Sequence, residues 1–354
     1  TLHVRKDGIE LDSLSCLTFN QLKFHPYLSA QNSGKWRFIA SVHCPPFPAQ
    51  RLFASLPSGL FRHLQGIEAD GELSYDFLLD ADFNQLDSLK FSSDLHGHHF
   101  RLRSLGSSDL TRMNDEFEYT AYDGDRPVRT FMIGPSNPSF RPLDRISPLL
   151  HMAVMQSEDG SFFYHQGFYP GAIQEALAYD LQVGRFARGG SSITMQLVKN
   201  VFLNKHKNIA RKLEEALIVW LIENQHLTSK ERMYEVYLNI AEWGPMVYGA
   251  AEASHFYFKK EPSELTAQEA IFMASVIPRP KHFYWSFNSD GTLRDNQEGY
   301  FRILARRLAA KGMMTEEQAE SFVPNVEITG PAYDLIIRKD SLTVQPTDSL
   351  TIVE

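Results

Sequence analysis

Hydrophobic and polar positions alternate along much of the first third of the chain. From Leu73 to Phe83 the odd positions are Leu, Tyr, Phe, Leu, Ala and Phe, while most even positions are polar. This period of two predicts a β-strand with one buried face, because successive side chains of a strand point to opposite sides. The alternation recurs at 36–42 and 117–121, and Asp123-Gly124 is typical of a hairpin turn. We therefore expect an antiparallel sheet with one face open to water.

The pattern becomes helical after a stretch rich in Pro, Ser and Asn at 133–142. Ser147-Pro148 is typical of a helix start, with Ser as N-cap and Pro in the first turn. Capping boxes predict three further starts, at Thr228-x-x-Glu231, Thr266-x-x-Glu269 and Thr315-x-x-Gln318.

These patterns predict an α+β fold in which an N-terminal antiparallel β domain is followed by a mainly α-helical domain. The expected boundaries are 1–135 for the β domain, 140–325 for the helical domain and 326–354 for a C-terminal tail or edge strand. The length of 354 residues agrees with two domains at about 150 residues each.

Composition excludes several classes of protein. The chain is 43% hydrophobic and 22% charged, which excludes a wholly disordered chain, a collagen-like repeat and a coiled coil. It carries 35 Lys and Arg against 43 Asp and Glu, a net charge of −8, so it is not a general nucleic-acid binder. The longest apolar run, 216–222, is far shorter than the about 20 residues of a membrane span, so we expect no anchor within this chain. Cys16 and Cys44 are too few for a disulfide framework, and both one bridge and two free thiols agree with the sequence.

Glu158 is the first candidate for chemistry. Leu150, Val154 and Glu158 are four residues apart, so the carboxylate continues the apolar stripe of the predicted helix. We expect partial burial to raise its pKa toward the range of a general base or acid. The alternative is an inward Glu that pairs with an Arg or a helix terminus.

A basic segment follows, with seven cations and no acid from Gly184 to Lys212. Its cations are Arg185, Arg188, Lys199, Lys205, Lys207, Arg211 and Lys212. It contains Gly189-Gly190-Ser191-Ser192-Ile193-Thr194-Met195-Gln196, where small hydroxyl residues before a helix offer N–H groups to an anion. Phosphate or pyrophosphate binding and a solvated basic face are both open interpretations.

Arg211 and Glu215 begin one inward stripe with Ile218 and Ile222. The spacing predicts an i, i+4 ion pair. That pair is either purely structural or, beside the Gly/Ser segment, an anion site with a carboxylate at its rim.

Four motifs together resemble those of glycosyltransferase family 51, the peptidoglycan transglycosylases. They are Glu158-Asp159-x-x-Phe162-x-x-His165-x-Gly167, Gly190 to Gln196, Arg211-Lys212-x-x-Glu215, and Lys230-x-x-x-x-Glu235-x-Tyr237-x-Asn239. The second departs from the family pattern, with Ser192 for the usual Thr and Met195 for the first of two Gln. The fifth family motif is poorly matched around Arg302-Ile303-Leu304. Asn239 to Gly244 looks most like the monofunctional type, and the transpeptidase motifs are absent from the sequence.

The resemblance implies a lysozyme-like helical domain that polymerises lipid II into β-1,4 glycan strands, with inversion and release of undecaprenyl pyrophosphate. It implies that Glu158 is the general base and that Lys199 and Arg211 clamp the pyrophosphate. Glu215, the second catalytic residue, would orient these cations or hold a divalent ion. The implied substrate- and pyrophosphate-binding residues are Ser192, Thr194, Gln196, Lys199, Asn200, Arg211 and Lys212. The implied supporting residues are Asp159, Phe162, His165 and Gly190.

No cofactor is strictly required by this chemistry, and Asp159 and Glu215 are the candidate ligands of a Mg²⁺ or Mn²⁺ ion. We assign Glu235 to structure. The implied partners are lipid II, the growing lipid-linked glycan strand, the membrane surface and cell-wall synthesis proteins, with no nucleic acid. The implied location is the bacterial cell envelope, at the periplasmic face of the inner membrane.

An aromatic and basic cluster between the first two motifs suits contact with a membrane surface, although core packing accounts equally for about half of its residues. It comprises Phe162, Phe163, Tyr164, Phe168, Tyr169, Ile173, Leu177 and Phe186, with Arg185 and Arg188. The run 56–83 faintly resembles AsmA-type envelope proteins, which handle lipids. Two rival functions stay open: a lysozyme-like enzyme that cleaves glycan, and a non-catalytic envelope protein that binds lipid or acts as a scaffold.

Overall fold

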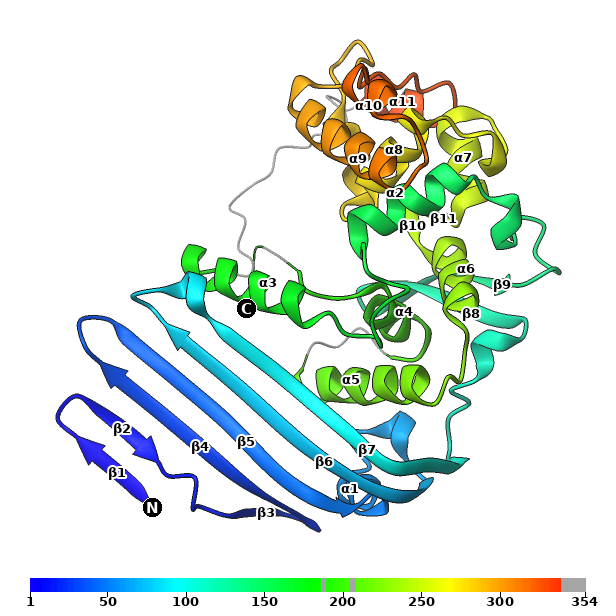
Figure 1. The fold of residues 1–354 in the computed structure, drawn as a ribbon. Coiled ribbons are helices and arrows are strands. Elements are labelled where there is room, and N and C mark those ends of the chain that lie inside the picture. The colour runs from blue at the N-terminus through cyan, green and yellow to red at the C-terminus, as the bar shows by residue number, and fades with distance from the viewer. Residues whose placement is uncertain (186, 188, 204–207, 339–354) are drawn as a thin grey trace. The chain divides into compact units, whose positions relative to one another are not determined.

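The predicted strands and helices are present in the computed structural model of the chain, which describes residues 1–185, 187, 189–203 and 208–338 (Figure 1). The α+β class, with a β-rich N-terminal part and a helical part after it, is confirmed. The strands are β1 (Leu2–Arg5), β2 (Gly8–Leu11), β3 (Leu17–Phe19), β4 (Leu22–Asn32), β5 (Trp36–Pro48), β6 (Ile67–Asp82), β7 (Lys90–Leu105), β8 (Phe117–Asp123), β9 (Arg126–Ile133), β10 (Glu242–Gly244) and β11 (Val247–Tyr248).

Helices dominate the second half of the chain. The α-helices are α1 (Gln50–Ser55), α2 (Pro148–Glu158), α3 (Pro170–Val183), α4 (Ile193–Val201), α5 (Ile209–Asn224), α6 (Lys230–Ile240), α7 (Ala250–Phe258), α8 (Ala267–Val276), α9 (Glu298–Ala310), α10 (Glu316–Glu320) and α11 (Ala332–Ile337). The 3-10 helices are η1 (Arg62–Leu64), η2 (Leu86–Ser88), η3 (Arg112–Asn114), η4 (Leu143–Arg145), η5 (Pro262–Glu264), η6 (Pro280–Ser286) and η7 (Asp295–Gln297).

The chain divides into two units, each made of two separate stretches. Unit 1 comprises Thr1–Arg112 and Phe163–Ser229, and unit 2 comprises Met113–Phe162 and Lys230–Glu354. The domains predicted from the sequence are continuous stretches, and their boundaries stay a prediction. The hairpin β8–β9, which the sequence groups with the N-terminal β region, belongs to unit 2.

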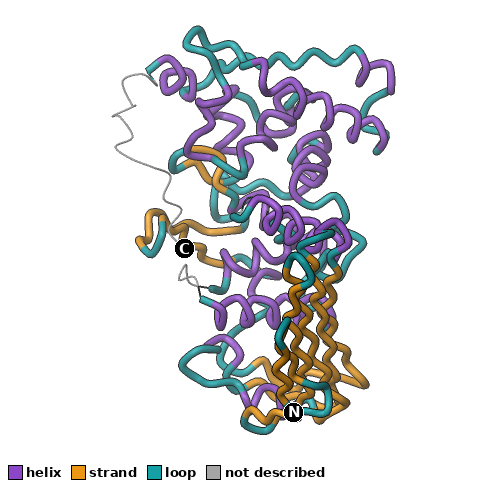
Figure 2. The backbone as a smooth tube through the Cα atoms, turned by 90° about the vertical axis from the view of Figure 1, so that its left-hand side faces the viewer, coloured by secondary structure: helices purple, strands orange, loops and turns teal. Residues whose placement is uncertain are grey.

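Unit 1 is built on an antiparallel sheet in the order β1-β2-β4-β5-β6-β7, with β3 paired to β4 (Figure 1). Figure 2 shows the long strands as one twisted layer. In the register of the sheet Ala40 lies opposite Leu28 on one side and Leu79 on the other, so the apolar positions of neighbouring strands share one face. The opposite face carries ion pairs such as Arg37–Asp80 (2.7 Å) and faces water. The predicted antiparallel sheet with two unlike faces is thus confirmed.

Helices α3 and α5 cover this apolar face near β7 (Figure 1). Trp220 of α5 is the anchor: its indole Nε1 donates to the Leu95 carbonyl oxygen at 2.8 Å, and its ring centroid lies 5.0 Å from that of Phe100. Toward the other edge of the sheet, Val4, Ile9 and Phe38 on the same face are exposed. The core of unit 1 therefore lies between α5 and the β6–β7 side of the sheet.

Unit 2 combines the hairpin β8–β9 with helices around an aromatic core. The predicted hairpin is present, but its turn is Gly124-Asp125, one residue later than predicted, because Asp123 is the last residue of β8 and pairs with Arg126. In the core the Tyr257 ring makes edge-to-face contacts with Phe272 and Phe283, at centroid distances of 5.0 and 5.2 Å.

Most of the predicted helix caps of unit 2 are confirmed. Ser147 caps α2, and Thr266 and Thr315 open α8 and α10 with complete capping boxes. The box at Thr228 is wrong, because α6 begins only at Lys230. The Thr228 hydroxyl is buried and finds no hydrogen-bond partner within the part of the chain that the structure describes.

The described part of the predicted C-terminal tail, 326–338, is neither a tail nor an edge strand. It packs against other parts of unit 2: the amides of Thr329 and Gly330 donate to the Tyr257 carbonyl oxygen, and α11 buries Ala332 and Ile336. Residues 339–354 lie outside the described residues.

Two further findings concern the cysteines and the lengths of the helices. Cys16 is exposed, Cys44 is buried, and both are free thiols. Among the described residues no helix is long and apolar enough to cross a bilayer.

Trp220 tests this account of the unit 1 core. We expect Trp220→Ala to lower the free energy of unfolding by about 3–5 kcal/mol, because it removes a buried ring and leaves a cavity beneath α5. Trp36→Ala, at an exposed ring of the same sheet, is the control and should change stability by less than about 1 kcal/mol. Urea unfolding of both variants measures the difference, and equal losses would contradict the assignment of the core.

Candidate functional site

The predicted site residues are divided between the two units. Glu158, Asp159 and Phe162 belong to unit 2, whereas the residues from His165 to Glu215 belong to unit 1. Each group has its own local geometry.

Glu158 is the last residue of α2. Ser147 Oγ accepts the Leu149 amide at 3.3 Å at the start of this helix, and Leu150 and Val154 are buried. Glu158 continues their stripe and is half-buried, as its spacing predicts. Asp159 ends the helix: its amide donates to the Met155 carbonyl oxygen at 2.8 Å, and its side chain is buried.

Two buried tyrosines of α6 lie within electrostatic reach of these carboxylates. Burial raises the pKa of Tyr234 and of Tyr237 well above the usual value, and the charges of Glu158 and Asp159 add to this rise. Both phenols therefore stay neutral at physiological pH. Tyr234 also donates its hydroxyl to the His151 carbonyl oxygen at 2.5 Å, which joins α6 to α2.

Phe162 is fully buried, so it belongs to the core and not to a membrane-facing cluster. Its ring centroid lies 5.6 Å from that of Tyr234 and 4.5 Å from Lys230 Nζ. This cation–π contact places the first residue of α6 beside the first motif.

The start of α4 carries the second motif in unit 1. Ser192 is the N-cap: its Oγ accepts the Met195 amide at 3.2 Å and donates to the Gly167 carbonyl oxygen at 2.5 Å. Thr194 is fully buried, and its Oγ1 donates to Glu223 Oε1 at 2.6 Å. Both hydroxyls thus make bonds inside the protein, and their predicted role in pyrophosphate binding stays a prediction.

The other residues of this segment are more accessible. Gln196, Lys199 and Asn200 on α4 are partly exposed, as is Gly190. A Cβ at Gly190 would lie 3.0 Å from the Ile173 Cα, so a larger residue there would have to push the α3 backbone away by a few tenths of an ångström. His165 is half-buried, with its ring stacked on Tyr169 at 6.4 Å. Arg188, Lys205, Lys207 and Phe186 lie outside the described residues.

The first turn of α5 gathers two cations around one buried carboxylate. Arg211 Nη1 lies 3.2 Å from Glu215 Oε2, and Lys212 Nζ lies 2.5 Å from Glu215 Oε1. Glu215 is only 1% exposed and Arg211 14%. The predicted i, i+4 pair is confirmed, and Lys212 adds a second partner. Because two cations contact one carboxylate, the group of Arg211, Lys212 and Glu215 carries a net positive charge. Arg211 Nε is buried and has no hydrogen-bond partner among the described residues.

Part of the predicted aromatic cluster is exposed. Tyr164 is 84% exposed, and Phe163 and Tyr169 are exposed as well. Arg185, after α3, is also exposed.

The family model described as Transglycosylase matches residues 125–303, just over half of the chain. The chain belongs to the transglycosylase family. The resemblance to family 51 is thereby confirmed.

Curated relatives agree with this assignment. This transglycosylase is 40% identical over 169 residues to the biosynthetic peptidoglycan transglycosylase of Paraburkholderia xenovorans, an alignment that covers 48% of this chain and 68% of the relative. The proteins of the same name from Chromobacterium violaceum and Paraburkholderia phytofirmans are 41% and 43% identical. Those alignments cover 48% and 47% of this chain and 71% and 67% of the relatives. The monofunctional type is thus confirmed, whereas the likeness of 56–83 to AsmA-type proteins stays a prediction.

The sequence analysis missed two buried acids of the transglycosylase. Glu214 accepts the His63 amide at 2.7 Å, and Glu223 accepts the Thr194 hydroxyl. Glu223 lies eight residues after Glu215 and four after the buried Val219, so the stripe that singled out Glu215 extends to it. A Cβ at Gly167 would overlap the Val219 side chain, which explains the Gly that closes the first motif.

Glu215 by itself is not prepared to bind a metal ion. Both carboxylate oxygens of Glu215 already accept from cations, so a divalent ion there would have to displace Arg211 and Lys212. Among the described residues no group of three or more His, Cys, Asp or Glu side chains is arranged to hold a metal. The roles of Asp159 and Glu215 as metal ligands stay a prediction.

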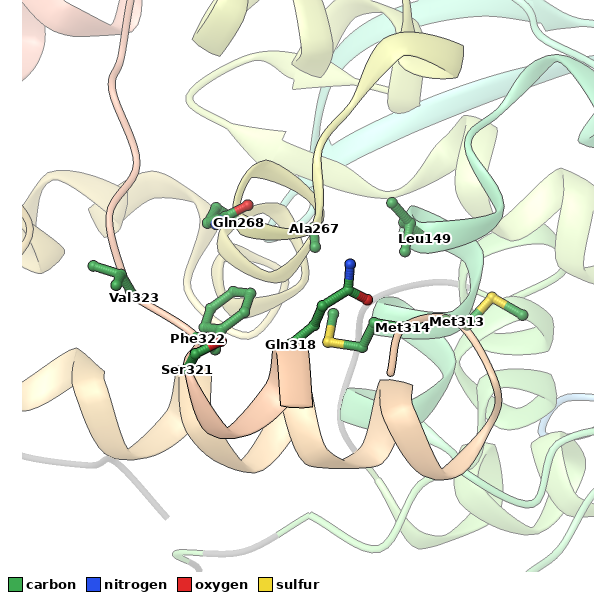
Figure 3. Close-up of a pocket in the computed structure, with 9 residues that line it drawn as sticks. All are labelled: Leu149, Ala267, Gln268, Met313, Met314, Gln318, Ser321, Phe322 and Val323. Atoms are coloured by element: carbon green, nitrogen blue, oxygen red, sulfur yellow. The ribbon is translucent and has the colours of Figure 1, made fainter. Parts of the chain in front are cut away.

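A cavity of about 420 Å³ in unit 2 contains none of the predicted site residues (Figure 3). Its walls come from the starts of α2 and α8 and from the segment around α10. The lining residues are Leu149, Ala267, Gln268, Met313, Met314, Gln318, Ser321, Phe322 and Val323.

The pair Thr194–Glu223 yields a test of the second motif. We expect Thr194→Val to lower the free energy of unfolding by about 1–3 kcal/mol, because a buried carboxylate loses a donor. Thr194→Ser keeps the hydroxyl and should retain most of the stability. Urea unfolding measures both. A Val variant with unchanged stability but weaker binding of lipid II would instead assign Thr194 to the substrate.

Proposed function

We propose that this transglycosylase is a peptidoglycan glycosyltransferase that polymerises lipid II into β-1,4 glycan strands and releases undecaprenyl pyrophosphate. The observation that carries the proposal is the family match over residues 125–303, which includes Glu158 at the end of α2 and the cation pair around Glu215. The named relatives are biosynthetic peptidoglycan transglycosylases, and this supports the same substrate class.

The proposed reaction is an inverting displacement. The 4-hydroxyl oxygen of the acceptor sugar bonds to the anomeric carbon of the donor, and the bond from that carbon to the pyrophosphate oxygen breaks with its electron pair. Glu158 takes the hydroxyl proton. A positioned base of this kind contributes about 10²–10⁴-fold to the rate.

The leaving pyrophosphate needs cations, because negative charge builds up on it as the bond breaks. We assign this role to Arg211, Lys212 and Lys199. Glu215 holds Arg211 and Lys212 at the first turn of α5, where the Lys212 side chain is 49% exposed and can reach a phosphate oxygen. Gln196 and Asn200, partly exposed on α4, can donate further hydrogen bonds to the substrate.

A lipid-linked substrate requires access to a membrane surface. The exposed aromatic side chains of Phe163, Tyr164 and Tyr169, together with Arg185, support interfacial contact by this segment. We propose that the enzyme acts in the cell envelope, at the periplasmic face of the inner membrane and with other cell-wall synthesis proteins as partners.

Incubation with lipid II separates this proposal from the rival hydrolase. We expect the full chain to convert lipid II into long glycan strands while preformed glycan keeps its length, because the chemistry joins sugars. Gel analysis of both substrates measures the two outcomes. Shortened glycan without polymer would contradict the proposal and support a lysozyme-like enzyme.

Removal of divalent ions tests the cation pair. Because Arg211 and Lys212 occupy Glu215, we expect polymerisation in EDTA to stay within about threefold of the rate in Mg²⁺. Initial rates in both buffers measure this ratio. A loss of about 100-fold or more in EDTA, restored by Mg²⁺ or Mn²⁺, would show that a metal shares the role of the cations.

A further inference from the structure

Helix α9 contacts the end of α2 just before Glu158. Arg307 Nη1 donates to the Gln156 carbonyl oxygen at 2.6 Å, and the hydroxyls of Tyr300 and Ser157 are 2.8 Å apart. Gln156 and Ser157 are the two residues that precede Glu158. Both contacts lie within unit 2.

Arg307 supplies a hydrogen-bond donor to a carbonyl group at the C-terminal end of α2. The last carbonyl groups of a helix lack partners within it, so the final turn frays unless another group binds them. A guanidinium is well suited, because it donates a hydrogen bond and its positive charge complements the negative end of the helix dipole. Gln156 is in this final turn of α2, and Glu158 ends it.

Helix α9 is itself firmly held. Phe301, Leu304 and Leu308 form a buried stripe along it. Tyr300 and Arg307 are seven residues apart, two helical turns, so they project from the same side and reach α2 together. Burial raises the pKa of Tyr300 to about 12, so its hydroxyl remains protonated at physiological pH.

We propose that Tyr300 and Arg307 are positioning residues, which hold the last turn of α2 so that the Glu158 carboxylate keeps its reactive orientation. This inference rests on the proposed function of Glu158. A displacement of about 1 Å in a catalytic group can cost about 100-fold in rate, so a modest clamp on the backbone is enough to matter.

Arg302, by contrast, does not reach α2. It pairs with Glu298 one turn earlier on α9, at 2.7 Å. Arg307, five residues later, is the cation of this helix that reaches the catalytic helix.

Neighbouring arginines provide a matched comparison. Arg306 is exposed and makes no hydrogen bond or ion pair with another described residue, so Arg306→Gln removes the same charge from the same helix without touching α2. We expect Arg307→Gln to lower kcat for lipid II polymerisation about 10- to 100-fold, with KM within about twofold of wild type. Arg306→Gln should keep both constants. Arg307→Lys, which can still donate to the carbonyl group, should recover most of the rate.

Tyr300 is tested by a double-mutant cycle with Ser157. Tyr300→Phe and Ser157→Ala should each lower kcat by about threefold or more, and the double variant should lose little beyond the larger single effect, because one contact is removed in all three. Additive losses would show that Tyr300 does not act through Ser157.

The outcomes separate this inference from the proposed function. Polymer from wild type, with equal rates for the Gln variants of Arg306 and Arg307, would overturn the positioning role alone. A rate for Arg307→Gln that falls only with the folded fraction, measured by thermal unfolding, would make Arg307 purely structural and also overturn it. A wild type that makes no polymer would refute the proposed function and this inference with it.

Discussion

The cost of taking a carboxylate out of water is the constraint on which this structure depends. Helix α5 buries three acids, Glu214, Glu215 and Glu223, and each needs a donor. The donors come from different places: the His63 amide of η1, Arg211 and Lys212 in the first turn of α5 itself, and the Thr194 hydroxyl of α4. These hydrogen bonds connect α5 to η1 and to α4, which carries the second motif, and they fix Arg211 and Lys212 at the start of α5.

The same constraint acts differently on α2 in unit 2. Glu158 stands at the last position of the helix, half-buried, with Asp159 buried beside it and two neutral tyrosines of α6 nearby. Any movement of the helix end would displace this carboxylate. The helix is held at its start by Ser147, in its middle by Tyr234 and at its end by Arg307. The position of the acid therefore depends on a local N-cap and on two helices, α6 and α9, that are distant in sequence.

Local signals in the sequence predicted what depends on local geometry. Alternation identified β6, side-chain caps identified the starts of α2, α8 and α10, and the i, i+4 spacing identified the pair Arg211–Glu215. The predicted capping box at Thr228 was wrong because it rested on residue types alone, and α6 begins at Lys230, two residues after Thr228. The hydrogen bonds from Thr194 to Glu223 and from Arg307 to α2 could not be predicted from the sequence. Their partners are 29 and 151 positions apart, and only tertiary packing brings them together.

The role of Glu158 is the centre of this account, and its most direct test is the rate of lipid II polymerisation by Glu158→Gln. The amide keeps the shape of the side chain but cannot take a proton, so the account predicts a loss in kcat of about 10²–10⁴-fold with an unchanged unfolding transition. Glu231→Gln, at an exposed acid of α6, serves as the control and should keep the wild-type rate. Polymerisation by Glu158→Gln at a rate close to that of the control would contradict the account.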